Sequence, residues 1–179
     1  MSEPKPPRPA KLITGLLHGP GDALKLALQA MTGEFGPLDH LSRAAPFGHT
    51  SYYEKEMGRG LVRRYASFQE LVDPGRLAGI KLVTNRLEKE IAEDGRRRIN
   101  IDPGLLSEER LVLATGKNYL HRVYLRDGIH ADLTLIYEQD SYRALPWTYP
   151  DYCTPFAIHL FGFLRKRLLF QRGGRLPIR

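Results

Sequence analysis

Apolar and polar residues in the first half of the chain follow two spacings, one typical of strands and one typical of helices. Apolar runs bounded by Gly, Pro and Asp predict strands at Lys11–His18, Leu38–Phe47, Leu61–Leu71 and Arg96–Ile101. Apolar residues three and four positions apart predict one helix that begins after Asp22 and a second over Arg76–Glu93. Between these elements, Tyr52–Met57 is predicted to form a short helix or turn.

The second half of the chain combines strong turn signals with longer apolar segments. Asp102-Pro103-Gly104 predicts a turn, and Arg110–Thr115 predicts a strand that is buried on both faces. Asp127-Gly128 is a typical hairpin turn between two alternating segments. The remaining predicted elements are the hairpin strands Tyr119–Leu125 and Ile129–Tyr137, an aromatic loop over Pro146–Pro155 and a last helix over Phe156–Phe170.

The predicted order of elements up to residue 101 is β-α-β-β-α-β, which is typical of a ferredoxin-like unit. The hairpin and the last helix then follow as extensions. We therefore predict an α+β fold with a mainly antiparallel mixed sheet, a ferredoxin-like start, a β-hairpin extension, a C-terminal helix and helices on one face of the sheet.

The net charge of +7 is concentrated at the two ends of the chain. Arg165–Arg179 contains six basic residues and no acidic residue, whereas Leu12–Leu164 contains 18 basic and 19 acidic residues. The predicted body is therefore nearly neutral, and basic ends of this kind can bind RNA, anionic lipid or nothing at all. We predict a disordered Pro-rich arm over residues 1–10, a single α+β domain over 11–170 and a basic flexible tail over 171–179.

Composition also narrows the class of protein. Cys153 is the single cysteine, so the chain cannot form an internal disulfide or a cysteine-based zinc site. The longest apolar stretch, residues 154–164, contains His159 and is too short to span a bilayer. The sequence thus predicts a cytoplasmic protein without a membrane span.

The predicted hairpin carries the best candidate for acid–base chemistry. With a two-residue turn at Asp127-Gly128, Val123 would pair with Asp132, and His121 would lie on the same face as Asp132. A carboxylate beside an imidazole orients it and favours its protonated form, as proton transfer requires. The alternative is an ordinary solvated pair on an open sheet face. We predict His121 and Asp132 as catalytic residues, together with Glu56.

Polar residues on otherwise apolar elements predict a site for an anion. Arg97 and Arg122 share strand faces with apolar residues, so each needs an anionic partner, either a ligand or an internal acid such as Glu56, Glu88 or Asp132. The predicted ligand-binding residues are Lys81, Asn85 and Glu88 on one helix flank, and Arg97, Asn100, Asp102, Lys117 and Arg122 at strand ends.

Other motifs are weaker. The loop Gly15–Gly21 lies between a strand and a helix but matches no phosphate-binding fingerprint, so a tight turn is its simpler interpretation. His121, His130 and Asp132 lack the spacing of a known metal motif, and we predict no metal site. The aromatic segment Pro146–Tyr152 is interpreted as a wedge in the core with Trp147 as its plug, although such a loop can also stack on a base or a sugar.

Several of these segments together resemble a bacterial family known as domain of unknown function 4416. The resemblance implies one domain over nearly the whole chain and implies no activity. Asp132 stands where a glutamate is expected, and Arg165–Arg179 resembles an extension private to this chain. The matching segments are Tyr52-Tyr53, Glu56-Met57-Gly58, Lys81, Thr84-Asn85, Glu88, Arg97, Asn100–Gly104, Leu113–Thr115, Lys117, Tyr119, His121–Leu125, Gly128-Ile129 and Trp147–Tyr152.

Three classes of function follow from these residues. The first is a protein that binds a small anionic ligand, a nucleotide or a phosphorylated metabolite, with possible acid–base catalysis. The second is an RNA- or ribosome-associated protein that acts through residues 165–179. The third is a structural or interaction module in which every polar cluster is paired internally. No cofactor follows from the sequence.

Overall fold

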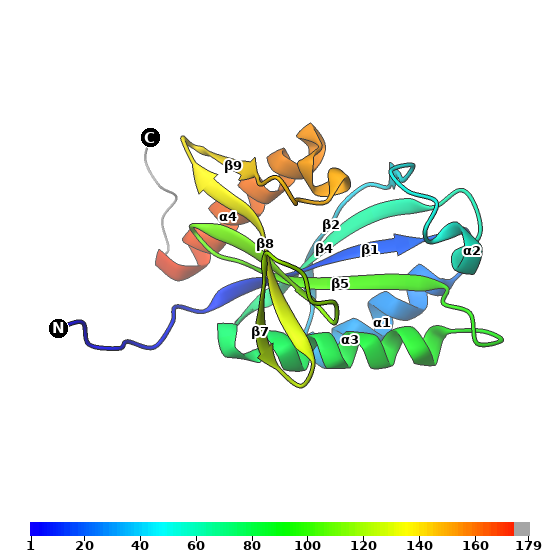
Figure 1. Cartoon of the computed structure of the whole chain (residues 1–179), viewed down its shortest axis with the longest axis horizontal. Coiled ribbons are helices and arrows are strands. Elements are labelled where there is room, and N and C mark those ends of the chain that lie inside the picture. Colours follow the sequence, from blue (N-terminus) through cyan, green and yellow to red (C-terminus); the bar gives the residue numbers. More distant parts are fainter. Residues whose placement is uncertain (174–179) are drawn as a thin grey trace.

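The computed structural model describes residues 1–173 and shows nine strands in one open sheet in which the paired strands run antiparallel (Figure 1). The strand order is β2-β4-β1-β5-β6-β8-β7, with β3 paired to β4 and β9 paired to β8. The strands are β1 (Ala10–His18), β2 (Leu38–Leu41), β3 (Ala45–Pro46), β4 (Val62–Val72), β5 (Ile99–Leu106), β6 (Arg110–Thr115), β7 (Arg122–Arg126), β8 (Ile129–Glu138) and β9 (Ser141–Ala144).

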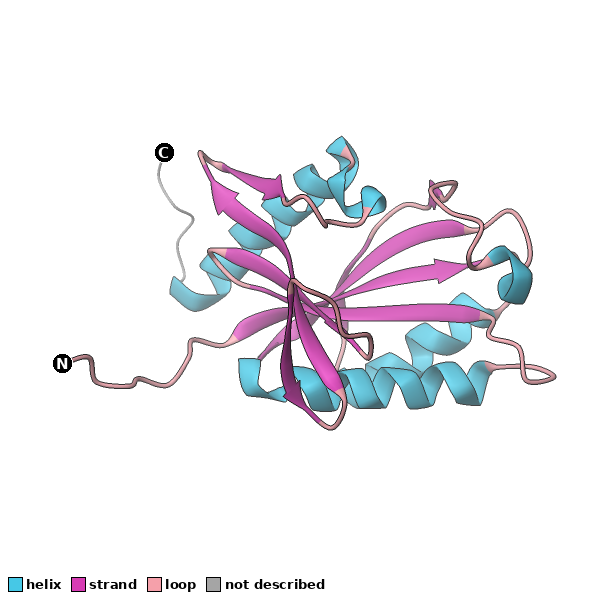
Figure 2. Cartoon of the chain, viewed as in Figure 1, coloured by secondary structure: helices cyan, strands magenta, loops and turns pink. Residues whose placement is uncertain are grey.

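Helices cover both faces of this sheet (Figure 2). On one face, α1 (Ala23–Phe35) and α3 (Leu77–Ile91) pack on a core that includes Leu12, Leu16 and Ile101. On the other face, α4 (Pro155–Gly173) packs on Ile13, Leu111 and Leu135. Alternate residues of β1 therefore supply both cores. The short helix α2 (Glu54–Met57) lies at one end of the sheet, and two 3-10 turns cover Pro74–Arg76 and Pro150–Cys153.

The α+β class and the mainly antiparallel sheet are confirmed, but several predicted elements are wrong. The helices do not all lie on one face, because α4 covers the face opposite α1 and α3. The predicted strand Leu38–Phe47 is two short strands, and β9 was not predicted. The predicted tail begins inside α4, which continues to Gly173, and the rest of the tail lies outside the described residues. The division into arm, domain and tail stays a prediction.

The predicted turn at Asp102-Pro103-Gly104 lies inside β5. Up to Pro103, β5 pairs only with β1, so a missing amide hydrogen is tolerated on the open side of the strand. Gly104 is where pairing with β6 begins, and a Cβ there would lie 2.6 Å from Leu113 Cδ2 and 2.9 Å from the Val112 carbonyl oxygen. The glycine therefore serves close strand packing rather than a turn.

The sheet has two wings that diverge beyond this point. The first wing is β2, β3, β4, β1 and β5, and the second wing is β6, β8, β7 and β9. The pairing between β5 and β6 covers only Gly104–Leu106 with Leu111–Leu113. Beyond this pairing, side chains of α3 form hydrogen bonds with the free edge of β5. Lys81 Nζ donates to the Ile101 carbonyl oxygen at 2.9 Å, and the Ile101 amide donates to Glu88 Oε1 at 2.6 Å.

Side-chain bonds also attach the N-terminal arm and α4 to the sheet. Arg172 donates to Glu108 at 2.7 Å and to the carbonyl oxygen of Pro9. Arg165 donates to the Glu108 carbonyl oxygen at 2.7 Å, and Arg167 binds Asp39. Half of the basic residues assigned to the C-terminal end therefore hold α4 to the body. In the part of the chain that the structure describes, no helix is both long and apolar enough to cross a membrane.

Candidate functional site

The predicted site residues lie in two clusters around the divergence of the two wings. The first, the Arg97 cluster, contains residues of α2, α3, the segment just before β5 and the first half of β5. The second, the Asp132 cluster, lies on β7, β8 and the loop after β6. Two adjacent tyrosines join them, because Arg97 lies 5.5 Å from the Tyr53 ring, Lys117 Nζ lies 4.7 Å from the Tyr52 ring, and the two rings are 5.0 Å apart.

Arg97 is the centre of the first cluster. Its NH2 donates to Glu56 Oε2 at 2.7 Å, and its NH1 donates to Asn100 Oδ1 at 2.7 Å and lies 3.7 Å from Glu88 Oε2. Asn100 Nδ2 in turn donates to Asp102 Oδ2 at 2.7 Å. The structure therefore brings Glu56, Glu88, Arg97, Asn100 and Asp102 together in a hydrogen-bonded relay of acidic and basic groups with the neutral Asn100 amide between Arg97 and Asp102.

Arg63 extends this relay and was not predicted. Its NH1 donates to Asp102 Oδ2 at 3.2 Å, and its Nε lies 2.7 Å from Asp151 Oδ2. The arginine side chain is 5% exposed, and these two carboxylates compensate the free-energy cost of burying its charge. Arg63 belongs to β4 and Asp151 to the aromatic loop, and no local sequence pattern connects two residues so far apart.

Lys81 and Asn85 occupy different positions on α3. Lys81 is 8% exposed and is used by the β5 backbone, whereas Asn85 is partly exposed and lines a cavity. Burial raises the pKa of Glu88, although Lys81 and the Ile101 amide oppose the change. Lys81 and Glu88 therefore hold the β5 backbone, whereas Asn85 lines a cavity and forms no side-chain hydrogen bond with any of residues 1–173.

Asp132 is the centre of the second cluster. Its Oδ2 accepts from Arg122 Nε at 2.8 Å and lies 3.4 Å from His121 Nε2, and its Oδ1 accepts from Thr134 at 3.3 Å. The predicted neighbourhood of His121 and Asp132 is thus present, and Arg122 is part of it. Arg122 also donates to the Tyr149 hydroxyl at 2.6 Å and to the Lys117 carbonyl oxygen at 3.0 Å.

The predicted hairpin register is wrong by one residue beyond the turn. Arg126 pairs with Ile129 as predicted, but an irregularity between Tyr124 and Arg126 places Arg122, rather than Val123, opposite Asp132. A bulge adds one residue to one strand and reverses the alternation beyond it. The apolar residues on either side of Arg122 are open to solvent, since Leu120 is fully exposed and Tyr124 is 60% exposed.

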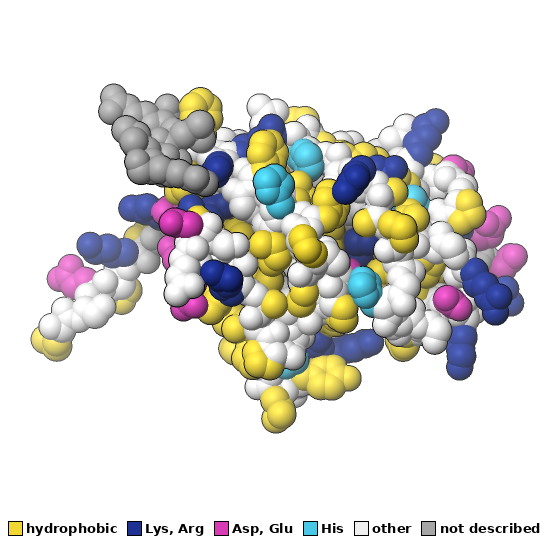
Figure 3. All heavy atoms as spheres, turned by 90° about the horizontal axis from the view of Figure 1, so that it is seen from above, with side chains coloured by type: hydrophobic (Ala, Val, Ile, Leu, Met, Phe, Trp, Pro, Cys, Tyr) yellow, Lys and Arg dark blue, Asp and Glu magenta, His cyan; other side chains and the backbone are white. Residues whose placement is uncertain are grey.

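Aromatic rings surround the second cluster. The His121 ring stacks on Trp147 with centroids 5.0 Å apart and lies parallel to Tyr119 at 6.3 Å, while Arg122 lies 4.6 Å from the Tyr119 centroid. Trp147 is 40% exposed and donates to the Leu133 carbonyl oxygen, so its interpretation as a core plug is wrong. Tyr152 is the fully buried member of that loop. Seen from the α4 side, hydrophobic side chains extend across the middle of the surface (Figure 3).

Burial changes the ionisation of the groups between the clusters. Burial, with a contribution from Asp102, raises the pKa of Tyr53 well above its usual value, and burial also raises the pKa of Tyr149. Both hydroxyls therefore stay neutral to a higher pH than those of ordinary tyrosines and act as hydrogen-bonding groups. The pKa of Glu56 is lowered by its hydrogen bond from Arg97, which keeps this carboxylate ionised. A paired carboxylate of this kind is a weak general base.

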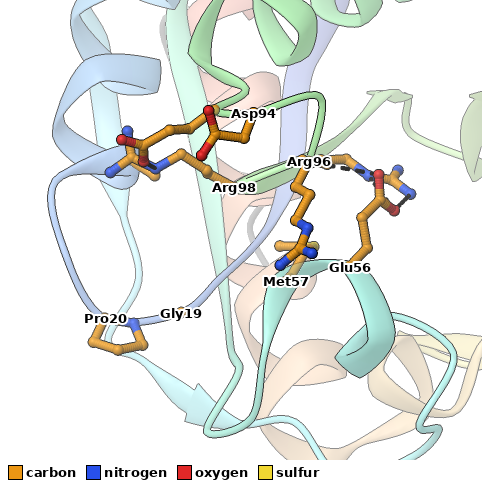
Figure 4. A pocket seen from close by; sticks show the side chains of 10 residues that line it. Gly19, Pro20, Glu56, Met57, Asp94, Arg96 and Arg98 are labelled. Atoms are coloured by element: carbon orange, nitrogen blue, oxygen red, sulfur yellow. Dashed lines mark hydrogen bonds and ion pairs between the residues drawn. The ribbon is translucent and has the colours of Figure 1, made fainter.

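Two cavities lie against the first cluster. One of about 300 Å³ is lined by Gly19 and Pro20 after β1, by Glu56 and Met57 of α2, and by arginines before β5 (Figure 4). The other, of about 280 Å³, is lined by Asn85, Glu88, Glu56 and Arg97. Within residues 1–173, no group of three or more His, Cys, Asp or Glu side chains is arranged to hold a metal ion.

Both predicted anion-binding arginines have internal acidic partners, Glu56 and Glu88 for Arg97 and Asp132 for Arg122. Lys117 differs, since no carboxylate in the described part of the chain forms an ion pair with it. In the sequence, the rings near Lys117 and Arg122 appear only as aromatic residues of Tyr52-Tyr53, of the predicted hairpin strand and of the predicted loop. Tyr52 and Tyr119 contact predicted ligand residues through their rings, and Tyr149 does so through a hydrogen bond from Arg122.

Comparison with known proteins gives one match. The model of a family described as a domain of unknown function, DUF4416, matches residues 8–168, which includes every residue of both clusters. No curated protein and no solved structure matches the chain.

Proposed function

Because the chain belongs to the DUF4416 family, whose description assigns no activity, we propose a function from the site geometry alone. We propose that the protein binds a small anionic ligand with a planar group, a nucleotide or a phosphorylated metabolite, between the two wings. Lys117, Arg122 and Arg97 would face the anionic group, and the rings of Tyr52, Tyr119 and Trp147 would face the planar group.

The observation that carries this proposal is the surroundings of Lys117. Its ammonium lies over the Tyr52 ring at 4.7 Å, and no carboxylate among residues 1–173 pairs with it. Tyr52 and Tyr119 are 60% and 59% exposed, and Trp147 is 40% exposed. A cation over one exposed ring, with further exposed rings beside Arg122 and His121, is a combination that anionic, ring-containing ligands use for charge pairing and stacking.

Proton transfer is a further part of the proposal. His121 and Asp132 are the pair that we propose for it, because His121 Nε2 is buried and has no hydrogen-bond partner among the described residues. Asp132 would orient the ring. Glu56 is the weaker candidate, since its carboxylate is held by Arg97.

A thermal-shift experiment with a panel of nucleotides and phosphorylated sugars tests the proposal. A ligand at about 100 times its Kd should stabilise the protein by ~2.7 kcal/mol and raise its melting temperature. Lys117→Gln should remove most of the shift, whereas Lys25→Gln, an exposed lysine on α1, is the matched control and should keep it. If no member of the panel moves the melting temperature, the proposal fails.

A proposal about the fold and an alternative function accompany this one. We propose that β2, β4, β1 and β5 with α1 and α3 form a ferredoxin-like unit. The antiparallel pairing of these four strands in this order and the position of both helices on one face support it.

RNA binding through residues 165–179 is the alternative function, and Lys166 is an exposed cation of this segment within the described residues. RNA binding that weakens steeply with salt, together with no response to the ligand panel, would favour that alternative.

A further inference from the structure

The helix α2 is a short and thinly attached element at the rim of the candidate site. It has four residues, and none of them is buried. Gly58 and Gly60, with φ of 81° and 74°, follow it and take backbone conformations that other residues rarely adopt. A segment with few buried contacts opens locally at low cost in free energy. The contacts that hold α2 to the sheet therefore decide its position.

One ion pair supplies the main contact. Glu56 Oε2 accepts from Arg97 NH2 at 2.7 Å and from Arg97 Nε at 3.3 Å, and Glu56 Oε1 accepts from the Arg97 amide at 3.4 Å. The Glu56 side chain is 39% exposed and the Arg97 side chain 24% exposed. Ion pairs exposed to this degree contribute little net stability, because water competes for both charges.

The same pair separates the two cavities of the site. Glu56 and Arg97 are the two residues that line both of them. In Figure 4, Glu56 and Met57 lie on the α2 side of the first cavity, opposite Pro20 and Arg98. The carboxylate and the guanidinium thus form a shared wall between spaces of about 300 and 280 Å³.

Arg97 would keep its orientation without Glu56. Its NH1 is held by Asn100 Oδ1 at 2.7 Å, and its guanidinium lies 5.5 Å from the Tyr53 ring centroid. The edge of the guanidinium that binds Glu56 presents two parallel N–H donors, an arrangement that fits a carboxylate or a phosphate equally well.

We propose that Glu56 is an internal occupant of the anion subsite on Arg97, and that α2 is a lid that opens when a ligand anion replaces the Glu56 carboxylate. This inference rests on the proposed function, since it assigns the regulation of that site. When α2 opens, the anionic group of the ligand takes the place of the Glu56 carboxylate on the Arg97 donors. The two cavities then join, because Glu56 no longer stands between them. The lid therefore lowers the affinity for weak anions and selects ligands that have a second anchor at Lys117 or Arg122.

Trypsin cleavage and phosphate titration test the lid together. The bond after Arg59 lies in the exposed segment next to Gly60, and its cleavage rate reports opening. Glu56→Gln should speed this cleavage about fivefold, as expected for the loss of an exposed ion pair. The variant should also bind inorganic phosphate several-fold more tightly than the wild-type protein. Glu34→Gln, at an exposed ion pair with Arg86 away from α2, is the matched control and should change neither value.

The outcomes separate this inference from the proposed function. Unchanged cleavage in Glu56→Gln would show that the ion pair does not hold the lid, and it overturns the inference even if the nucleotide panel succeeds. Faster cleavage without a gain in phosphate affinity overturns the assignment of Arg97 as an anion subsite. Phosphate that binds equally well to the Arg97→Gln/Glu56→Gln double variant also overturns it, whereas loss of binding in that variant supports it.

Discussion

Arg122 stands directly opposite Asp132 in the β7–β8 ladder, and its Nε donates to the Asp132 carboxylate at 2.8 Å while both side chains are almost fully buried, at 4% and 3% exposure. The remaining residues of β7 are exposed, so this pair is the main side-chain contact of the strand with the body. Asp132 also faces His121, and the pair therefore affects both stability and the proposed chemistry.

Removing one partner of this pair should destabilise the protein strongly. We expect Arg122→Ala to lower the free energy of unfolding by about 3–5 kcal/mol, because a buried carboxylate then lacks its cation. Urea denaturation measures the change. Arg126→Ala on the same strand is the control and should cost less than about 1 kcal/mol, because its ion pair with Asp127 is half exposed. Equal effects of the two variants would contradict this account.

The buried pair between Lys11 and Asp39 predicts acid sensitivity. Burial favours a higher pKa for Asp39, but hydrogen bonds from Lys11 and Ser67 outweigh it, and its pKa is below the usual value. A lowered carboxyl pKa stabilises the folded state above the unfolded pKa of about 3.9, and that stability disappears as the pH falls through the folded pKa.

We therefore expect Asp39→Asn to cost about 3–5 kcal/mol at pH 7, since Lys11 is fully buried and loses its partner. Urea denaturation at several pH values should show this difference shrinking below about pH 4. Asp127→Asn, at a half-exposed ion pair, serves as the control. A difference that stays constant from pH 7 to pH 3 would show that the Asp39 charge is not responsible.

The approach of β6 to β5 predicts that Gly104 cannot be enlarged. A methyl group there would meet Leu113 Cδ2 at 2.6 Å and a backbone oxygen at 2.9 Å, so we expect Gly104→Ala to cost about 1–3 kcal/mol. Gly33 in α1 has no atom within 4 Å of such a methyl group, and Gly33→Ala should stabilise the protein by about 0.5–1 kcal/mol. Thermal unfolding of both variants checks the opposite signs.

Two neighbouring tyrosines of the α4 core predict opposite responses to loss of their hydroxyl groups. Tyr65 donates to the Asp151 carbonyl oxygen at 2.9 Å, whereas the buried Tyr152 hydroxyl has no partner among the residues that the structure describes. We expect Tyr65→Phe to cost about 1 kcal/mol and Tyr152→Phe to be neutral or stabilising, as denaturant titration would show. A Cβ at Gly15 would overlap the Tyr152 hydroxyl, so Gly15→Ala should be tolerated better in the Tyr152→Phe background.

Sequence patterns predicted the elements with long, regular spacing well. The bounds of β6 match the prediction, and α3 lies within the predicted helix, because an apolar stripe or run directly reflects the face that is buried. The turn of the hairpin was also correct, since Asp127 and Gly128 both have positive φ, as this type of turn requires.

The details of the site required information that is absent from local patterns. A bulge in β7 reverses the faces of Arg122 and Val123, and nothing in the period-two spacing marks its position. Asp102-Pro103-Gly104 has the composition of a turn but lies within β5. Pro103 lies where the edge of the strand is open, and Gly104 allows β6 to approach closely. Arg63 was missed because its partner Asp151 lies far along the chain and becomes a neighbour only after folding.

The narrow β5–β6 junction has a mechanical consequence. With so short a ladder between them, the two wings would twist against each other if nothing else connected them. The core under α4 takes Ile13 and Tyr65 from one wing and Leu111 and Leu135 from the other, so this helix acts as a brace across the junction. Amide exchange in β6 and β8 should therefore speed up when the docking of α4 is weakened.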